Sequence, residues 1–376
     1  MIRENRLILK SPGADMKKFL IIVLIIVILG VAGYFAWVYL WPKFSPAPSP
    51  TPTPSPLPTG IAEAKLEVLS ANRVFDYWIQ RASGAVYYFS EDGKLWKIDE
   101  GGDEKNIISQ NINDLNSLSA GNQGKQAVIS FGPAFNPDFS LLNIEEVTWQ
   151  PLPEGAAAAA FDPAGRRLAY LKDNGTFTTL NLLNLDDKKT AEVIRFSQKG
   201  LGLEWILPDE IYLTQKPSHQ VQSSVLAANI KNKTVRTLIT GEFGLMVNWR
   251  ADGEKGLKFT NSLRENDLNL IDKSGLTLQP LGFLKTLPAK CALETLIYCA
   301  RPGEISSAAR LPDDYLKRKI YFKDIIAAFN PENGALETLW NAPEPALDAE
   351  NLKVFGGKLF FVNRYDRKLY SLEIEN

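Results

Sequence analysis

Short runs of apolar residues recur along most of the chain, each preceded by one turn sequence and followed by another. In FDPAGRRLAYLKDNG, at 161–175, the apolar run AYL lies between two such turns. Six further runs occupy the same position relative to their turns, at residues 85–99, 126–133, 209–217, 255–262, 295–302 and 358–374. The first six runs start about 40–46 residues apart and the last interval is about 20 residues longer, so the pattern predicts a repeated unit.

Each unit is expected to contain four short strands, of which the second is apolar on both faces and the third alternates, as in LWKID at 95–99. A period of this length with four strands is typical of propeller blades, whose second strand is covered by the neighbouring blades. Asp, Asn and Gly in the turns favour tight hairpins. We therefore predict an all-β fold, a seven-bladed β-propeller of four-stranded blades, over residues 61–376.

The two ends of this region predict how the ring closes. Residues 64–70, AKLEVLS, form a strand that belongs to no unit, and the last unit has only about three strands. We expect 64–70 to supply the outer strand of the last blade, which removes an exposed sheet edge. An insertion at 303–324 accounts for the length in excess of seven units.

The turn-strand segment at 161–171, FDPAGRRLAYL, resembles the repeat of TolB-type (PD40, WD40-like) bacterial propellers, in which Asp-Pro-x-Gly precedes an apolar strand. Residues 248–259, NWRADGEKGLKF, form a looser copy, and residues 203–214 keep the phase without the glycine. The resemblance extends over 61–376 as a repeat pattern. It implies an extracytoplasmic scaffold or binding role.

The N-terminal region predicts a membrane anchor followed by a stalk. Residues 19–41 carry no charge and are long enough for a transmembrane helix across about 30 Å of hydrocarbon. Five Lys and Arg residues precede this span and only Lys43 follows closely, so residues 1–18 are expected to be a cytoplasmic tail. Residues 42–60 are rich in proline and should form an extended stalk outside the cytoplasm. The alternative is a cleaved signal peptide, which would also place the propeller on the outer side of the cytoplasmic membrane.

Composition narrows the function classes. The formal net charge of −1 argues against a general nucleic-acid binder, which needs a basic surface. The chain has one histidine, His219, which is expected to be solvated in a polar loop, and two cysteines. No G-x-S-x-G, P-loop or G-x-G-x-x-G sequence is present. We therefore expect no catalytic residues, no metal site and no cofactor.

The insertion is the most individual segment and the candidate binding loop. Long insertions on a rigid scaffold often carry binding residues. The candidate recognition side chains are acidic, aromatic and basic: Asp313, Asp314, Tyr315, Lys317, Arg318 and Lys319. The alternative is a solvated rim loop whose aromatic side chains fold back onto the blade.

Cys291 and Cys299 are predicted to face each other on consecutive strands of the sixth blade. An extracytoplasmic location favours a disulfide between them. The alternative is two buried apolar residues without a bond. A zinc site would need two more ligands than this pair provides.

These features predict a single-pass protein of the cytoplasmic membrane that acts as a non-enzymatic protein-interaction scaffold for an envelope protein. The first alternative is a binder of glycan or cell-envelope polymer, which would need exposed aromatic and acidic side chains in the central funnel. The second is a propeller hydrolase or lyase, which would need convergent Arg, Glu, Asp or Tyr side chains there.

The charge asymmetry around residues 19–41 predicts that a protease added to intact spheroplasts cleaves the stalk or the propeller, because both lie outside the cytoplasm. The measurement is an immunoblot of the C-terminal domain before and after permeabilisation. A domain that is protected until the membrane is opened would show that the topology is reversed.

Overall fold

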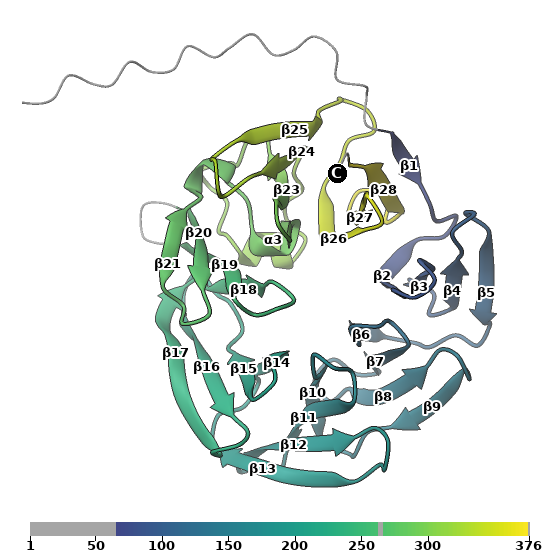
Figure 1. The fold of residues 1–376 in the computed structure, drawn as a ribbon, viewed down its shortest axis with the longest axis vertical. Helices are drawn as coiled ribbons and strands as arrows, with labels where there is room; N and C mark the ends of the chain where they lie inside the picture. The colour runs from purple at the N-terminus through teal and green to yellow at the C-terminus, as the bar shows by residue number, and fades with distance from the viewer. Residues whose placement is uncertain (1–64, 262–265, 375–376) are drawn as a thin grey trace, which may run out of the picture. The chain divides into compact units, whose positions relative to one another are not determined.

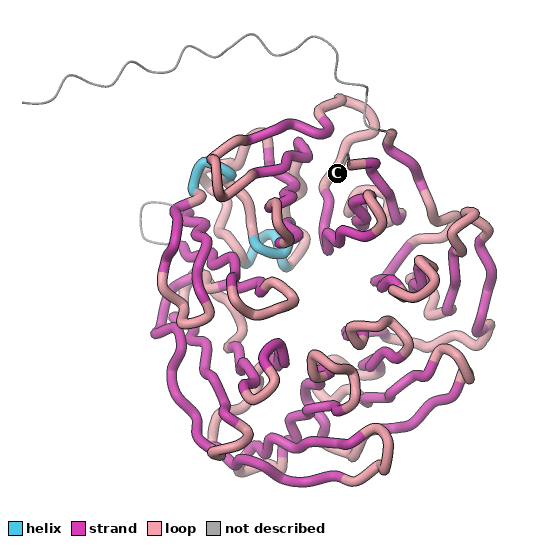
Figure 2. The backbone as a smooth tube through the Cα atoms, viewed as in Figure 1, coloured by secondary structure: helices cyan, strands magenta, loops and turns pink. Residues whose placement is uncertain are grey.

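The computed structural model describes residues 65–261 and 266–374. These residues form seven antiparallel four-stranded sheets arranged around a central axis (Figure 1). Apart from short helical segments around blade 6, the described chain consists of strands and loops (Figure 2). The chain is an all-β, seven-bladed propeller, as the repeat predicts.

Within each blade, the strands are labelled A to D from the centre outward. Blades 1 to 4 follow the chain order. Blade 1 consists of β2 (Val74–Ile79), β3 (Val86–Ser90), β4 (Leu95–Ile98) and β5 (Glu104–Ile108), and blade 2 of β6 (Leu115–Ala120), β7 (Gln126–Phe131), β8 (Asp138–Asn143) and β9 (Thr148–Pro151). Blade 3 consists of β10 (Ala156–Phe161), β11 (Arg167–Asp173), β12 (Thr178–Asn184) and β13 (Thr190–Phe196), and blade 4 of β14 (Gly202–Leu207), β15 (Glu210–Thr214), β16 (Gln222–Asn229) and β17 (Thr234–Phe243).

The remaining three blades contain the last strands of the chain and its first. Blade 5 consists of β18 (Met246–Trp249), β19 (Lys255–Asn261), β20 (Asn266–Asp272) and β21 (Thr277–Pro280). Blade 6 consists of β22 (Cys291–Leu293), β23 (Ile297–Pro302), β24 (Asp324–Phe329) and β25 (Leu336–Trp340), and blade 7 of β26 (Ala349–Phe355), β27 (Lys358–Asn363), β28 (Leu369–Glu373) and β1 (Leu66–Val68). The helical segments are η1 (Gly282–Leu284), η2 (Pro288–Lys290) and α3 (Asp313–Leu316).

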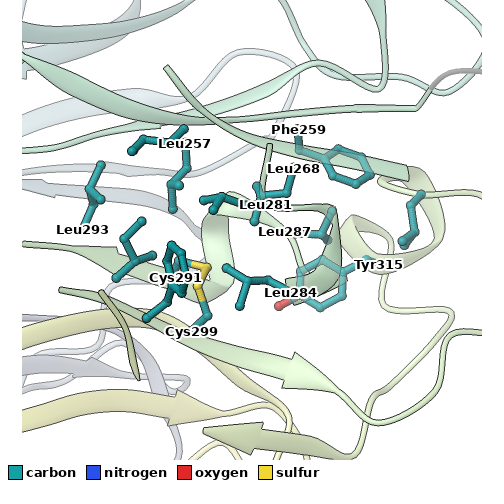
Figure 3. Packing of buried hydrophobic residues seen from close by; sticks show 14 of the residues in the cluster. Leu257, Phe259, Leu268, Leu281, Leu284, Leu287, Cys291, Leu293, Cys299 and Tyr315 are labelled. Carbon is teal, nitrogen blue, oxygen red and sulfur yellow. A yellow bond between two sulfur atoms is a disulfide. The ribbon is translucent and has the colours of Figure 1, made fainter. Parts of the chain in front are cut away.

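All seven predicted apolar runs contain the B strand of a blade, namely β3, β7, β11, β15, β19, β23 and β27. In β3 all five residues are buried, and in β27 five of six are. Both faces of a B strand pack against neighbouring sheets, which removes the polar alternation that a half-exposed strand would show. The core accordingly lies in the seams between blades, as the cluster between blades 5 and 6 illustrates (Figure 3).

The predicted ring closure is confirmed. Strand β1 pairs with β28 in antiparallel register, with Leu66 opposite Leu372 and Val68 opposite Tyr370. The N–H of Leu69 continues the pairing by donating to the carbonyl of Leu369 at 2.8 Å. The first described strand is therefore the outer strand of the last blade, and the last blade has no unpaired edge at β28.

Side chains from blade 7 reinforce the seam with blade 1. The guanidinium of Arg367 donates to the carbonyls of Val74 and Phe75, both at 2.8 Å. Closer to the axis, Lys353 Nζ donates to the carbonyl of Tyr77 at 2.6 Å, and the Tyr77 hydroxyl donates to the carbonyl of Asn351 at 2.7 Å. These bonds join residues nearly 300 positions apart in sequence.

The Asp-Pro-Ala-Gly turn of blade 3 has a local structural role. Asp162 is buried and accepts hydrogen bonds from the backbone N–H groups of Arg166 (2.7 Å) and Arg167 (3.0 Å), and from Arg167 Nε (3.0 Å). Gly165 has φ +69°, which completes the tight turn. The Arg167 guanidinium then lies over the ring of Trp205 in blade 4, 4.6 Å from its centroid. The turn thus fixes a contact between successive blades.

The predicted disulfide is present. Cys291 on β22 lies opposite Cys299 on β23, and the two sulfur atoms are bonded (Figure 3). Both cysteines are buried in the cluster between blades 5 and 6, next to leucines of η1 and its flanks. The bond links the A strand of blade 6 to its B strand.

Within residues 65–261 and 266–374, no helix is long and apolar enough to cross a membrane. The span predicted at 19–41, the tail at 1–18 and the stalk at 42–60 all lie outside the described residues.

Ring closure by β1 predicts a large effect of N-terminal truncation. A chain that begins at residue 72 lacks β1, so β28 becomes an open edge. We expect this chain to melt at a lower temperature, or to aggregate, compared with a chain that begins at residue 60. Differential scanning calorimetry and light scattering measure both effects, and equal melting temperatures would show that β1 does not close the ring.

Candidate functional site

The connections between strands alternate between the two faces of the ring because consecutive strands are antiparallel. Loops from B to C strands and from D to A strands lie on one face, called here the BC/DA face. Loops from A to B and from C to D strands lie on the other, the AB/CD face. The insertion at 303–323 connects β23 to β24 and therefore belongs to the BC/DA face.

The two candidate aspartates of the insertion turn inward. Asp313 begins α3, and its Oδ2 accepts bonds from the backbone N–H and the ring Nδ1 of His219, at 2.7 and 3.0 Å. Although burial raises the pKa of Asp313, hydrogen bonds from His219 and Lys317 outweigh it and lower the pKa to about 2. Asp314 Oδ2 accepts from the N–H of Arg310 at 2.9 Å. Both carboxylates hold the loop's shape.

The predicted solvated histidine is instead partly buried. His219 lies in the B–C loop of blade 4, and its contact with Asp313 anchors the insertion of blade 6 to that loop. The sequence offers no signal for this contact, because 94 residues separate the partners.

The candidate Tyr315 is also structural. Its side chain is buried and its ring stacks on that of Phe322, with centroids 5.6 Å apart. The guanidinium of Arg364 lies 4.0 Å from the centroid of Tyr315, and Arg364 Nη2 donates to the Tyr315 carbonyl at 3.0 Å. The prediction that this tyrosine contacts a partner is not supported by its position, since the ring packs inside the loop.

Beneath the insertion lies a buried ionic network that the sequence did not reveal. Lys290 Nζ donates to Asp324 Oδ2 at 2.7 Å, to Asp348 Oδ1 at 2.5 Å and to the carbonyl of Ala349 at 2.9 Å. Arg364 Nη1 donates to Asp348 Oδ2 at 2.7 Å. The side chains of Lys290, Asp324 and Asp348 are fully buried and that of Arg364 nearly so. The network joins the insertion and blade 6 to blade 7.

Opposite charges keep this network ionised. Burial opposes the charge of Lys290, but the neighbouring carboxylates outweigh it and raise the pKa of Lys290. Burial also raises the pKa of Asp324, to about 6, while Lys290 lowers it. Lys290 is therefore the group that makes an ionised Asp324 tolerable in this position.

The three candidate cations differ from the acids, because Lys317, Arg318 and Lys319 are all exposed. Lys317 Nζ lies 3.1 Å from Asp313 Oδ1, and Arg318 Nη2 lies 3.5 Å from Glu350 Oε1. No described carboxylate lies within 4 Å of Lys319. Of the six residues predicted to bind a partner, Asp313 binds His219 of blade 4, Asp314 and Tyr315 make contacts within the insertion, and the three cations face solvent.

Exposed apolar side chains gather on the BC/DA face. Among the large exposed hydrophobic residues of the described chain, six lie in its loops: Phe135, Val221, Phe283, Leu316, Tyr321 and Tyr365. The AB/CD loops contain only Val147 and Leu276 of this set, and the others lie on outer strands or beside them. Phe135, in the B–C loop of blade 2, is 92% exposed. Most of the large exposed apolar residues in the loops of the described chain therefore lie on the BC/DA face.

The centre of the ring holds a cavity of about 880 Å³. The innermost strands β2, β18, β22 and β26 contribute to its walls. Its charged lining residues are Asp76, Arg81, Glu294, Glu350 and Lys353. The indole rings of Trp78 and Trp249, which also border it, are nearly fully buried.

The charged pair deepest in the seam of blades 7 and 1 is engaged in structure. Burial raises the pKa of Asp76 and lowers the pKa of Lys353, each against the influence of the other. Asp76 Oδ1 accepts from the N–H of Tyr77 at 2.8 Å and from the amide of Asn351. Asp76 is therefore held by the described chain itself at the edge of the cavity.

Comparison with known proteins identifies the fold alone. No family model matches the sequence, and no curated protein matches it. Solved structures match over most of the described chain. A lyase, oligogalacturonate lyase from Vibrio parahaemolyticus, has TM-score 0.57 and 8% identity, covering 84% of this chain and 95% of that one.

Two further structures are similar at the same level. The β-propeller domain of Cps50 (Swd1) from Myceliophteria thermophila has TM-score 0.54 and 8% identity over 83% of this chain and 100% of that one. The tricorn protease has TM-score 0.52 and 9% identity over 84% of this chain, which spans about a third (34%) of its length. The shared feature is the propeller. At these identities the likeness says nothing about activity.

The buried network predicts that Lys290→Met destabilises the propeller by roughly 3–5 kcal/mol, because Asp324 loses its cation inside the protein. With Lys290 gone, the pKa of Asp324 in the folded state rises further above its unfolded value. Stability lost at pH 8 is then partly regained as the pH falls toward 5 and Asp324 takes up a proton. Melting temperatures at both pH values measure this.

The matched control is Lys323→Met, which removes an exposed cation next to Asp324 in sequence. This variant should melt within about one degree of the unmodified chain. A Lys290→Met protein as stable as the control at pH 8 would contradict the role of Lys290 as the counterion of buried Asp324.

Proposed function

We propose that this chain is a membrane-anchored, extracytoplasmic propeller that acts as a non-enzymatic scaffold and binds an envelope protein through its BC/DA face. The observation that carries the proposal is the gathering of exposed aromatic and aliphatic side chains on that face. Burying such a surface against a partner removes apolar area from water, which favours association.

Two features support the location. The uncharged span at 19–41, with basic residues before it, favours a single pass with the propeller outside. The disulfide between Cys291 and Cys299 is of the kind that persists in oxidising compartments and is rare in the cytosol. The TolB-type repeat resemblance adds an extracytoplasmic expectation from the sequence.

We propose a protein partner because of how the aromatic rings along the central cavity are buried. A glycan site would need aromatic rings open for stacking. Along the cavity the rings of Trp78, Trp249 and Tyr315 are nearly fully buried, and those of Phe75 and Phe355 are partly buried. Four of the five exposed rings of the described chain stand on the BC/DA face instead. Singly exposed aromatic side chains on a rigid surface suit the recognition of a folded protein or peptide.

Site-specific photocrosslinking in native membranes tests the proposal. A photoreactive amino acid placed at Phe135, Val221 or Tyr365 should give discrete protein adducts, because these positions lie on the BC/DA face. The same amino acid at Val147 or Leu276 on the AB/CD face, which are 40% and 67% exposed and so match Tyr365 and Val221, should give none. Adducts of equal yield from both faces, or from neither, would overturn the assignment of the binding face.

A further inference from the structure

The insertion separates its charges by sign. Two of its three carboxylates, Asp313 and Asp314, are half-buried and bind backbone N–H groups of the protein, so only Glu304 is exposed. Its five basic residues are all exposed: Arg310, Lys317, Arg318, Lys319 and Lys323. Lys317 is paired with Asp313 and Arg318 with Glu350, whereas Arg310, Lys319 and Lys323 have no described carboxylate within 4 Å of their side-chain nitrogens. The excess of exposed cations gives the loop a local positive surface, although the net charge of the whole chain is −1.

Two stacked tyrosines stand beside these cations. Tyr321 of the insertion and Tyr365 of the B–C loop of blade 7 lie with ring centroids 5.5 Å apart, and they are 44% and 43% exposed. The guanidinium of Arg364 lies under Tyr321, 4.8 Å from its centroid. Leu316, also 44% exposed, precedes Lys317 in sequence and borders the central cavity. The insertion thus carries both exposed apolar and exposed cationic side chains.

This surface is mounted rigidly. Arg364 donates to the carbonyls of Tyr315 and Ile320 in the insertion, at 3.0 and 3.3 Å, and the N–H of Phe322 donates to Asp348 at 3.1 Å. A loop held from below by buried charges loses little conformational entropy when it binds. Less of the free energy gained from its contacts with a partner is then offset by ordering the loop. The network explains why a long insertion presents one defined surface.

We propose that this surface binds an acidic segment of the partner protein that also carries apolar side chains. The surface, called the basic–tyrosine patch, consists of Leu316, Lys317, Arg318, Lys319, Tyr321, Lys323 and Tyr365. The inference rests on the proposed function and names the chemistry of the partner. Carboxylates of the segment pair with the cations, and its apolar side chains pack on the tyrosines, residues enriched at binding hot spots.

The position of the patch favours a peptide over an anionic lipid surface. The described chain starts at residue 65, on the AB/CD face, since β1 runs toward the BC/DA face in antiparallel register with β28. The patch lies on the face opposite to this point. Because lysines and tyrosines also suit a membrane interface, vesicle binding is measured beside peptide binding.

The experiment uses the full-length chain in an uncharged detergent and fluorescence anisotropy with two labelled dodecapeptides. One peptide is acidic, EELEDFEELEDF, and the other is a basic counterpart, KKLKNFKKLKNF. The unmodified chain should bind the acidic peptide alone, more weakly as salt is raised. The variant Lys317→Glu/Lys319→Glu/Lys323→Glu should weaken binding about tenfold or more. Tyr321→Ala/Tyr365→Ala should weaken it while leaving the charge unchanged.

Matched controls separate the patch from general charge. Lys188→Glu/Lys231→Glu/Lys233→Glu reverses three exposed lysines on the AB/CD face and should bind like the unmodified chain. The conservative variant Lys317→Arg/Lys319→Arg/Lys323→Arg should retain binding. Melting temperatures confirm that each variant is folded.

Three results would overturn the proposal. These are equal binding of both peptides, equal losses in the patch and control variants, and patch-dependent binding of vesicles containing phosphatidylglycerol without binding of the acidic peptide. If the patch fails in these ways while crosslinks at Phe135 and Val221 persist, the BC/DA face remains the binding face and only the acidic-segment inference falls.

Discussion

The pairing of β1 with β28 is the constraint on which the rest of this propeller depends. A ring of sheets buries its B strands only if every blade has a neighbour on both sides, and blade 7 obtains its outer strand from the start of the domain. Side-chain hydrogen bonds also cross the seam between blades 7 and 1, where Arg367 and Lys353 of blade 7 donate to backbone carbonyls of blade 1. Hydrophobic packing, which is not directional, is supplemented there by bonds that fix the position of one blade against the next.

The insertion of blade 6 uses the same principle next to this seam. A loop of about twenty residues without support would sample many conformations and would bind weakly. Here Lys290, Asp348 and Arg364 form a buried ionic base, and aromatic rings stack on it. Burying such charges costs desolvation that their attraction only offsets, so their value lies more in defining one loop geometry than in added stability. The exposed cations can then occupy fixed places.

Sequence periodicity predicted the parts of this structure that repeat. The B strands, the closing strand at 64–70 and the register that places Cys291 opposite Cys299 follow from period, turn spacing and pairing geometry. The charged network could not be predicted, because Lys290 and Asp348 lie in connections whose lengths differ from blade to blade, and Asp324 begins β24 directly after the insertion. The same holds for Asp313, which looks like a surface acid in sequence and becomes a structural ligand of His219 only in the fold.

The two faces of the ring differ in their loops. Residue 65, just before β1, lies on the AB/CD face, and β28 ends there as well, with the N–H of Ile374 bonded to the carbonyl of Gly357 in an A–B turn. The AB/CD loops contain two of the large exposed apolar residues, Val147 and Leu276. The BC/DA face bears the insertion with its five exposed basic residues and the loops with exposed aromatic rings. Because consecutive strands alternate in direction, the B–C loops lie on the face opposite to residue 65. The insertion of blade 6 is such a loop, and it adds residues to the BC/DA face without interrupting the β1–β28 pairing that closes the ring.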